Sequence, residues 1–405
     1  MEFFGGLFMK IAKKVSALVL CALMLITSVF NEGSVSFLQA VKASAMAGHE
    51  QKYDDARVEL DFNKGWKFAF SDDSASYLKG FDDSSWESVD LPHDFSISQG
   101  FSETGTEAES GNIPGGTGWY RKWFNLYEYY TGDCITIDFD GVYQHAYVYV
   151  NGQYVGENHY GYNSFSIEIS DYLICSNSAL NLIAVKVVNE LPSSRWYSGS
   201  GIYRDVKLTV KGPVHVSLYG PQVTTPGIAN GDGTVNADVT MHNDTSISKK
   251  VIVETTVLDN NHNPVSDTAV SPVTLVPANA EYTVTLKPKV ASPKLWSVEN
   301  PNLYKLKTVI KDENGELIDE YHTDFGFRYI NWDADEGFSL NGELIKLKGV
   351  SLHHDQGALG AVQEYEAIYR QIVTLKEMGC NAIRTSHNTA SRVLIDICNE
   401  LGMLV

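Results

Sequence analysis

The C-terminal segment constrains the fold most, because strand and helix patterns alternate along it. Apolar runs at residues 344–351, 382–383 and 403–405 are typical of strands, and the spacing of apolar residues predicts helices over 365–378 and 392–401. This order predicts parallel strands joined by right-handed crossovers. A (β/α)8 barrel needs about 250 residues, so we expect roughly two of its eight units here.

Polar side chains follow the first two of these strands. His353, His354 and Asp355 come after the first, and the run Arg384 to Asn388, which includes His387, spans the end of the second. Barrel enzymes build their active sites at this end of the strands. Together these groups suit a pocket for a hydroxyl-rich ligand; a satisfied buried polar network is the alternative. We do not expect a metal on His353, His354 and Asp355, because neighbouring side chains on an extended loop diverge.

The two preceding segments are predicted to be β-sandwiches. Residues 60–216 hold short strands, and Asn151-Gly152 is typical of a tight hairpin between residues 147–150 and 153–155. After a region rich in glycine and proline, alternating apolar residues continue to about residue 310, as in an immunoglobulin-like sandwich. We therefore expect a jelly-roll domain over 48–216, an immunoglobulin-like domain over 217–328 and the start of a barrel over 329–405.

Residues 1–47 resemble a secretory signal peptide. Three lysines precede an apolar run from Val15 to Phe30, and small residues around Ala45 offer cleavage sites. A membrane anchor is the alternative, since the run is only slightly shorter than a span. We expect a secreted or cell-surface protein with no membrane insertion after cleavage.

The negative net charge of the chain limits the classes of ligand that it is expected to bind. Cleavage after Ala47 would remove four lysines and two glutamates and take the formal net charge from −19 to −21. So acidic a chain is a poor partner for nucleic acid, and neutral sugars are compatible with it. Cys134, Cys175, Cys380 and Cys398 match neither a disulfide framework nor a zinc signature, and we expect buried free thiols. No cofactor is expected, while a structural or activating cation stays open.

The loop Leu191 to Asp205 is the second candidate for ligand contact. It contains Arg195, Trp196 and Tyr197, and aromatic faces and guanidinium groups suit sugars. Packing between domains is the alternative, and both can hold at once. Ser198 stands where a Gly-x-Ser-x-Gly elbow needs its first glycine, so the loop is not that of a serine hydrolase.

Several ordered motifs resemble glycoside hydrolase family 2, most closely its secreted bacterial β-galactosidases. They cover nearly all of the chain from about Phe62 to Val405: Leu91-Pro92-His93-Asp94, Gly118-Trp119-Tyr120-Arg121, Val150-Asn151-Gly152, Ser193 to Asp205, Leu295 to Tyr304, Lys346 to Asp355, Gly379 to Asn388 and Leu401-Gly402-Met403.

The resemblance implies a sugar-binding jelly roll, an immunoglobulin-like domain and a catalytic barrel with a retaining mechanism. By motif match, His353, Arg384, His387 and Asn388 would line the subsite for the terminal sugar, and Arg195 would approach it from the first domain. The family's two catalytic glutamates would lie beyond Val405. We give no catalytic role to the two Asn-Glu pairs of this chain, Asn189-Glu190 and Asn399-Glu400.

The prediction is therefore a glycosidase that releases terminal β-galactose from an oligosaccharide or glycan in its full-length form. A β-glucuronidase or β-mannosidase of the same family is the nearest alternative. A non-catalytic carbohydrate-binding protein made of sandwiches is an alternative from another class. We expect the chain alone to be inactive and to be a truncated piece, as its end within a strand pattern indicates.

Overall fold

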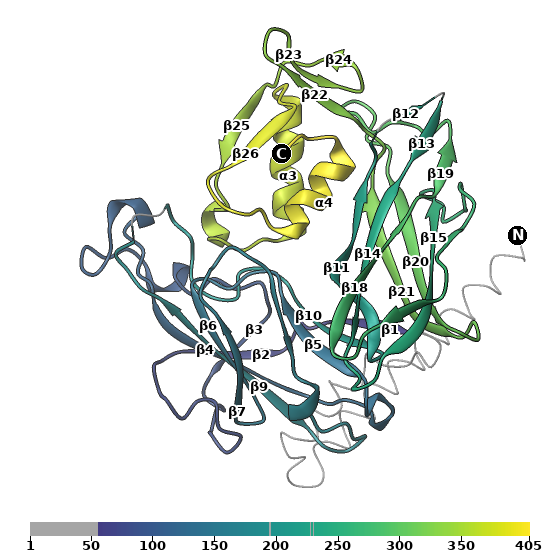
Figure 1. Ribbon diagram of the computed structural model, residues 1–405. Coiled ribbons are helices and arrows are strands. Elements are labelled where there is room, and N and C mark those ends of the chain that lie inside the picture. The colour runs from purple at the N-terminus through teal and green to yellow at the C-terminus, as the bar shows by residue number, and fades with distance from the viewer. Residues whose placement is uncertain (1–55, 194–195, 227, 230) are drawn as a thin grey trace, which may run out of the picture. The chain divides into compact units, whose positions relative to one another are not determined.

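The computed structural model describes residues 56–193, 196–226, 228–229 and 231–405 (Figure 1). The expected signal peptide, residues 1–47, and the candidate Arg195 lie outside the described residues. Among the helices that are described, none combines the length and the apolar character needed to cross a membrane.

The first sandwich consists of a six-stranded and a four-stranded antiparallel sheet. The larger sheet has the order β3-β2-β4-β9-β6-β7 and the smaller one β1-β10-β5-β8. Their strands are β1 (Arg57–Asp61), β2 (Trp66–Phe70), β3 (Glu87–Val89), β4 (Gly116–Phe124), β5 (Cys134–Phe139), β6 (His145–Val150), β7 (Gln153–Asn158), β8 (Phe165–Glu168), β9 (Asn181–Asn189) and β10 (Val206–Lys211). The predicted hairpin joins β6 to β7, with Asn151 and Gly152 both at positive φ as a type I′ turn requires.

The core of this sandwich follows from alternation along its strands. In β6 every second residue is buried, and these side chains meet those of β9 and β10 in one apolar cluster. Four 3-10 turns lie in the connections: η1 (Ile97–Gln99), η2 (Ala108–Ser110), η3 (Glu128–Tyr130) and η4 (Ser170–Tyr172).

The second sandwich starts three residues after β10 ends. Its sheets have the orders β11-β14-β18 and β16-β15-β20-β21, with β17 also paired to β15, and a small sheet β12-β13-β19 lies beside them. The strands are β11 (Val214–Thr224), β12 (Ile228–Ala229), β13 (Asp232–Thr234), β14 (Asn236–Asn243), β15 (Lys249–Leu258), β16 (Ala269–Val270), β17 (Thr274–Val276), β18 (Ala280–Leu286), β19 (Lys289–Ala291), β20 (Tyr304–Asp312) and β21 (Leu317–Phe325). Its core is an apolar cluster in which valine is the commonest residue, joined by leucine, isoleucine, methionine and aromatic side chains.

The start of the barrel follows a small three-stranded sheet. That sheet contains β22 (Ile330–Asp333), β23 (Gly337–Leu340) and β24 (Glu343–Leu344). The chain continues as β25 (Gly349–Leu352), the 3-10 turn η5 (Gly357–Leu359), α3 (Tyr365–Glu377), β26 (Ala382–Thr385) and α4 (Arg392–Leu401). β25 and β26 are parallel, and Leu404 forms a parallel bridge to Ala382.

Both helices lie against the strand pair, shown in yellow in Figure 1. Ile368 and Ile372 of α3 meet Leu394 and Ile397 of α4 in one buried cluster. Ser391 caps α4 by accepting the Leu394 N–H, and Gly402 ends the helix at a φ of 74°. Two sandwiches followed by two βα units confirm the predicted fold class.

Two details of the sequence prediction are wrong. Residues 344–351 do not form one buried strand: Leu344 belongs to β24 and is 61% exposed, and β25 begins only at Gly349. Between them, the Asn381 side chain bonds the backbone of Lys346 and Lys348, which replaces a strand ladder. Met378, expected on the inner face of its helix, follows the end of α3 and is 70% exposed.

Candidate functional site

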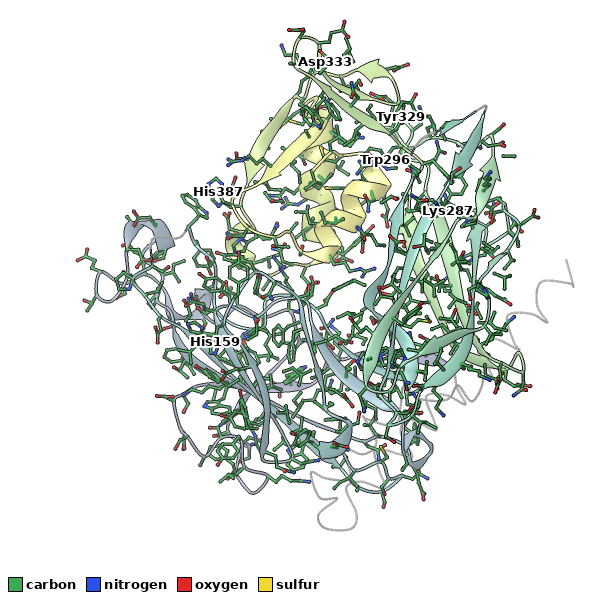
Figure 2. The ribbon with its side chains drawn as sticks, in the orientation of Figure 1. His159, Lys287, Trp296, Tyr329, Asp333 and His387 are labelled. Atoms are coloured by element: carbon green, nitrogen blue, oxygen red, sulfur yellow. The ribbon has the colours of Figure 1, made fainter. Side chains whose placement is uncertain are left out.

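The candidate site is centred on His353, directly after β25. Its imidazole ring stacks on the Trp196 indole with centroids 4.8 Å apart and an interplanar angle of 27°. The His387 ring, from the residue two positions after β26, meets His353 edge-on with centroids 6.1 Å apart. The parallel register pairs Leu352 with Thr385, which brings the two strand ends, and therefore both histidines, to the same edge. Figure 2 shows His387 beside this strand pair.

The other two barrel candidates lie at the same end of the strand pair. Asn388 lines a small cavity of about 30 Å³ together with His353 and His354. Arg384 is an exposed residue of β26 whose register partner is Ser351. The predicted residues thus gather at one strand edge, with His353 and His387 in ring contact.

The loop from the first sandwich reaches this edge through Trp196, a residue that the sequence analysis noted for its ring without assigning it to the site. Trp196 is 53% exposed, so one face of the indole covers His353 while much of the ring remains open to solvent. Aromatic rings with an open face are suited to stacking on a sugar ring. The pairing of Trp196 with His353 could not be read from the sequence, because nothing in it fixes which barrel loop the sandwich loop meets.

A buried carboxylate holds the loop in place. Asp94 is 2% exposed, and its Oδ1 accepts the backbone N–H groups of Ser96 and Ser200, each at 2.9 Å. Its Oδ2 accepts the Tyr197 hydroxyl at 2.5 Å and the N–H of Ala361 at 2.9 Å. Ala361 belongs to the barrel segment, so one carboxylate joins the sandwich loop to the barrel.

Two glycines let the backbone come this close to Asp94. Gly199 and Gly360 have φ values of +68° and +67°, and a Cβ on either one would overlap the carboxylate. Burial and the neighbouring Asp94 charge raise the pKa of Tyr197, so that its hydroxyl stays a donor to the carboxylate. The Leu91–Asp94 motif therefore supports the candidate site by holding the loop that contains Trp196.

His354 packs against residues of the first sandwich. Its ring packs edge-on against Tyr162 and also contacts Tyr203, and Nε2 lies 3.3 Å from the Ser198 carbonyl oxygen. Burial lowers its pKa to about 4, against an opposing effect of that carbonyl. The imidazole is therefore neutral at pH 7 and donates from Nε2.

Arg204 connects the sandwich to the barrel a second time. It is 2% exposed, and its guanidinium donates to the carbonyl oxygens of Tyr162 at 3.2 Å and Thr389 at 2.8 Å. Thr389 follows Asn388, so this cation fixes the loop after β26 from behind. A guanidinium suits this task because its donors diverge in a rigid plane.

Neither Asn-Glu pair lies at the carboxyl end of a barrel strand. The Asn189 side chain donates to the Gly199 carbonyl oxygen and to the Ser200 hydroxyl, within the first sandwich. Glu400 on α4 accepts the Tyr365 hydroxyl at 3.2 Å, and the Asn399 carbonyl accepts the Trp296 indole N–H. Asn189, Asn399 and Glu400 thus have structural partners.

The site as described offers one wall of a pocket: an indole, two imidazoles, an amide and a guanidinium at a barrel edge. These groups can stack on a ring and exchange hydrogen bonds with hydroxyl groups. They do not include a pair of carboxylates set across a bond, which glycoside hydrolysis requires.

Models of three parts of one family match this chain in order. The sugar-binding domain of glycosyl hydrolases family 2 matches residues 61–212, a second domain of that family matches 214–328, and its TIM barrel domain matches 334–405.

Individual relatives agree with these matches. The beta-galactosidase BoGH2A of Bacteroides ovatus is 40% identical over 86% of this chain and 41% of its own length. A putative beta-glucuronidase of Formosa agariphila is 39% identical over 86% of this chain and 33% of its own. A crystal structure of a glycosyl hydrolase family 2 member from Bacteroides cellulosilyticus has a TM-score of 0.78 at 39% identity, over 86% of this chain and 47% of that one. The chain spans less than half the length of these relatives.

Proposed function

Because the chain belongs to glycosyl hydrolase family 2, we propose that the whole protein hydrolyses terminal β-galactosides with retention of anomeric configuration. The observation that carries the proposal is the stack of Trp196 on His353 beside His387, which sets an open aromatic face at the carboxyl ends of two parallel strands. The 40% identity to BoGH2A, named a beta-galactosidase, favours galactose as the sugar.

In this proposal, the residues described here bind and orient the sugar. His353, His387 and Asn388 exchange hydrogen bonds with its hydroxyl groups, and Trp196 covers one face of the ring. A retaining enzyme then uses two carboxyl groups about 5–5.5 Å apart, one as the nucleophile and the other as the acid and later the base. The family resemblance assigns both to later barrel strands. The chain of 405 residues would therefore bind without catalysing.

The mechanism is tested on the full-length enzyme by proton NMR of the first sugar released from an aryl β-galactoside. Retention predicts that the β anomer forms first and then equilibrates with the α anomer. Initial release of the α anomer would refute the mechanism and leave the family assignment intact. The chain of 405 residues, assayed with the same substrate, is expected to show no turnover.

A β-glucuronidase is the second candidate, and the exposed Arg384 favours it. A guanidinium can pair with the carboxylate of a glucuronide, and one relative named a putative beta-glucuronidase is 39% identical, nearly as similar as BoGH2A. The ratio of kcat/KM for matched aryl galactosides, glucuronides and mannosides separates these specificities. A ratio that favours the galactoside supports our proposal, and one that favours either other sugar overturns it.

We also propose that the protein is exported by its N-terminal segment and acts outside the cytoplasm. The lysines and the apolar run of residues 10–30 support export, as does the row of small residues up to Ala47. N-terminal sequencing of the mature protein tests this. Cleavage between about residues 43 and 48 is expected, and an intact N-terminus on the mature protein would refute it.

A further inference from the structure

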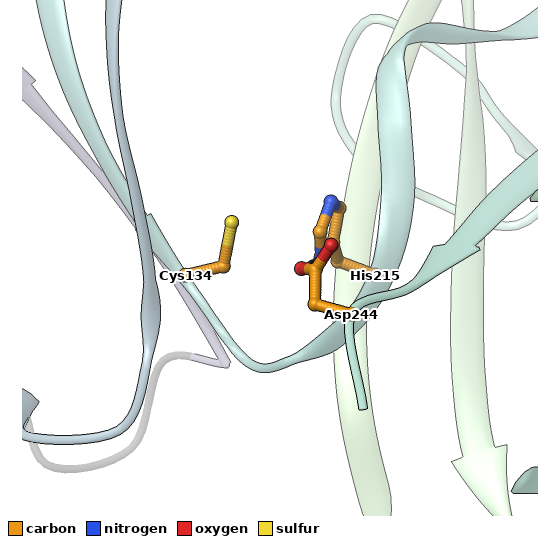
Figure 3. Close-up of side chains that lie close together, drawn as sticks. All are labelled: Cys134, His215 and Asp244. Atoms are coloured by element: carbon orange, nitrogen blue, oxygen red, sulfur yellow. Dashed lines mark ion pairs between the residues drawn. The ribbon is translucent and has the colours of Figure 1, made fainter. Parts of the chain in front are cut away.

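Three residues with metal-binding side chains meet where the two sandwiches are joined. Cys134 opens β5 and is the register partner of Lys211, the last residue of β10. His215 is the second residue of β11, and Asp244 directly follows β14. One ligand atom from each of Cys134, His215 and Asp244 lies within 4.8 Å of the other two (Figure 3). The group thus brackets the connection between the domains.

The group is buried and only partly satisfied. The residues Cys134 and His215 are 6% and 4% exposed, and the side chain of Asp244 is 20% exposed. Its Oδ1 lies 2.5 Å from His242 Nδ1. Asp244 Oδ2 lies 3.5 Å from His215 Nδ1 and, within the described part of the chain, accepts no hydrogen bond of good geometry. A buried carboxylate oxygen that is so weakly paired is able to accept a cation.

His215 is held in the form that binds a metal. Nδ1 lies 3.0 Å from the Gly212 carbonyl oxygen, which can only accept, so Nδ1 carries the proton and Nε2 keeps a lone pair. Histidine ligands in metal sites are oriented in this way, by a second N–H that donates to a backbone carbonyl. His242 gives Asp244 a similar supporting contact.

The thiol of Cys134 is buried beside the Asp244 carboxylate, with Lys211 and Glu168 nearby. A cation with two charges can replace the thiol proton, because a coordinated thiol is deprotonated. The thiolate and the Asp244 carboxylate would then balance the ion. The nearby Arg57 is already paired with Asp319 at 2.8 Å.

We propose that Cys134, His215 and Asp244 bind one zinc ion that fastens the first sandwich to the second. Sulfur, imidazole nitrogen and carboxylate oxygen form a set that zinc accepts, and a water molecule or a second carboxylate oxygen completes a four-coordinate site. Calcium and magnesium prefer six or more oxygen ligands, and this group offers one carboxylate. Zinc–ligand bonds of about 2.0–2.3 Å require the three side chains to draw together on binding.

The proposal is tested by measuring zinc binding to the purified full-length enzyme at neutral pH, after a chelator has removed any metal. Isothermal titration calorimetry is expected to give one zinc per chain with a Kd below about 1 μM, as structural zinc sites do. Titration with Co²⁺ is expected to produce a thiolate-to-cobalt absorption band, which reports the sulfur ligand directly. Absence of zinc binding by the wild-type chain would overturn the proposal.

Variants assign the ligands. Cys134→Ser is expected to weaken zinc binding by at least about 100-fold and to abolish the cobalt band, and His242→Gln to weaken binding by about 10-fold to 100-fold. Cys175→Ser is the matched control: another free thiol of the first sandwich, outside the cluster. Asp244→Asn, at a partly exposed position, provides a second ligand variant if Cys134→Ser does not fold. Binding that survives Cys134→Ser or Asp244→Asn unchanged would refute the assignment.

Discussion

Replacing Asp94 with asparagine removes one charge from the contact that joins the sandwich loop to the barrel. The carboxylate accepts four hydrogen bonds, three of them from backbone N–H groups. The amide oxygen of the introduced side chain can retain Ser96 and Ser200, while its NH2 group must face the Tyr197 hydroxyl and the Ala361 N–H. The hydroxyl can turn and accept, but the backbone N–H of Ala361 cannot.

The cost of this substitution follows from these contacts. One buried N–H without an acceptor costs about 1–3 kcal/mol, and each bond to a charged acceptor that becomes neutral loses about 1 kcal/mol. We therefore expect Asp94→Asn to lower the free energy of unfolding of this region by about 3–5 kcal/mol. Since about 1.4 kcal/mol corresponds to a factor of ten, amide exchange at Ala361 should accelerate by at least about 100-fold.

Hydrogen exchange of peptides that cover residues 357–363, followed by mass spectrometry, measures this directly. Asp335→Asn is the control, because Asp335 is an exposed residue of the β22–β23 turn. Urea unfolding of both variants, monitored by tryptophan fluorescence, gives the global effect. A loss below about 1 kcal/mol with unchanged exchange at Ala361 would refute the role assigned to Asp94.

Three further predictions test other contacts. The pKa of His354 is about 4 in the folded chain and 6.5 in the unfolded chain, so its contribution to stability is lost as pH falls from 6.5 towards 4, by at most about 3 kcal/mol. Urea unfolding across this range should therefore show a flatter pH dependence for His354→Gln than for wild type or for the exposed control His322→Gln. Equal slopes for His354→Gln and wild type would contradict this prediction. In the full-length enzyme, Trp196→Ala should remove about 1–1.5 kcal/mol of stacking and therefore lower kcat/KM about tenfold, mainly by raising KM. Trp332 is 67% exposed, and Trp332→Ala should leave kcat/KM unchanged. Lys376→Met should lower the free energy of unfolding by about 2 kcal/mol, because Lys376 Nζ donates to the carbonyl oxygens of Val298, Leu401 and Gly402. Calorimetry should show no comparable loss for Lys287→Met, at an exposed position. Equal losses in the two variants would argue against a stabilising role of the Lys376 hydrogen bonds.

The sequence predicted the elements whose signals are local. The Asn151–Gly152 turn, the helix from Arg392 to Leu401 and its end at Gly402 depend on residues close in the chain, and all three are confirmed. The strand over 344–351 was wrong because Asn381, from a distant segment, takes over the backbone bonds of residues 346 and 348. A local pattern contains no trace of such a partner.

The residues of the candidate site also fall into those that a local pattern predicts and those that depend on contacts between domains. His353, Arg384 and His387 could be named because they follow or end strands that the pattern predicts, and their roles in binding remain predictions. The contacts of Trp196 and Asp94 with the barrel depend on how a sandwich loop meets a barrel loop. The group of Cys134, His215 and Asp244 depends on the junction of two sandwiches, and its spacing in the sequence matches no metal motif.

The guanidinium of Arg204, which donates to Tyr162 in the sandwich and to Thr389 in the barrel, has a consequence for the history of the protein. A pocket wall that contains residues of two domains is not preserved when one of the domains is exchanged. A barrel that exchanged its partner sandwich for another would lose the support of the loop after β26, and a sandwich that moved to another barrel would lose the Thr389 acceptor of its buried guanidinium. The two domains are therefore expected to have diverged as one unit, with substitutions on either side of Arg204 matched by substitutions on the other.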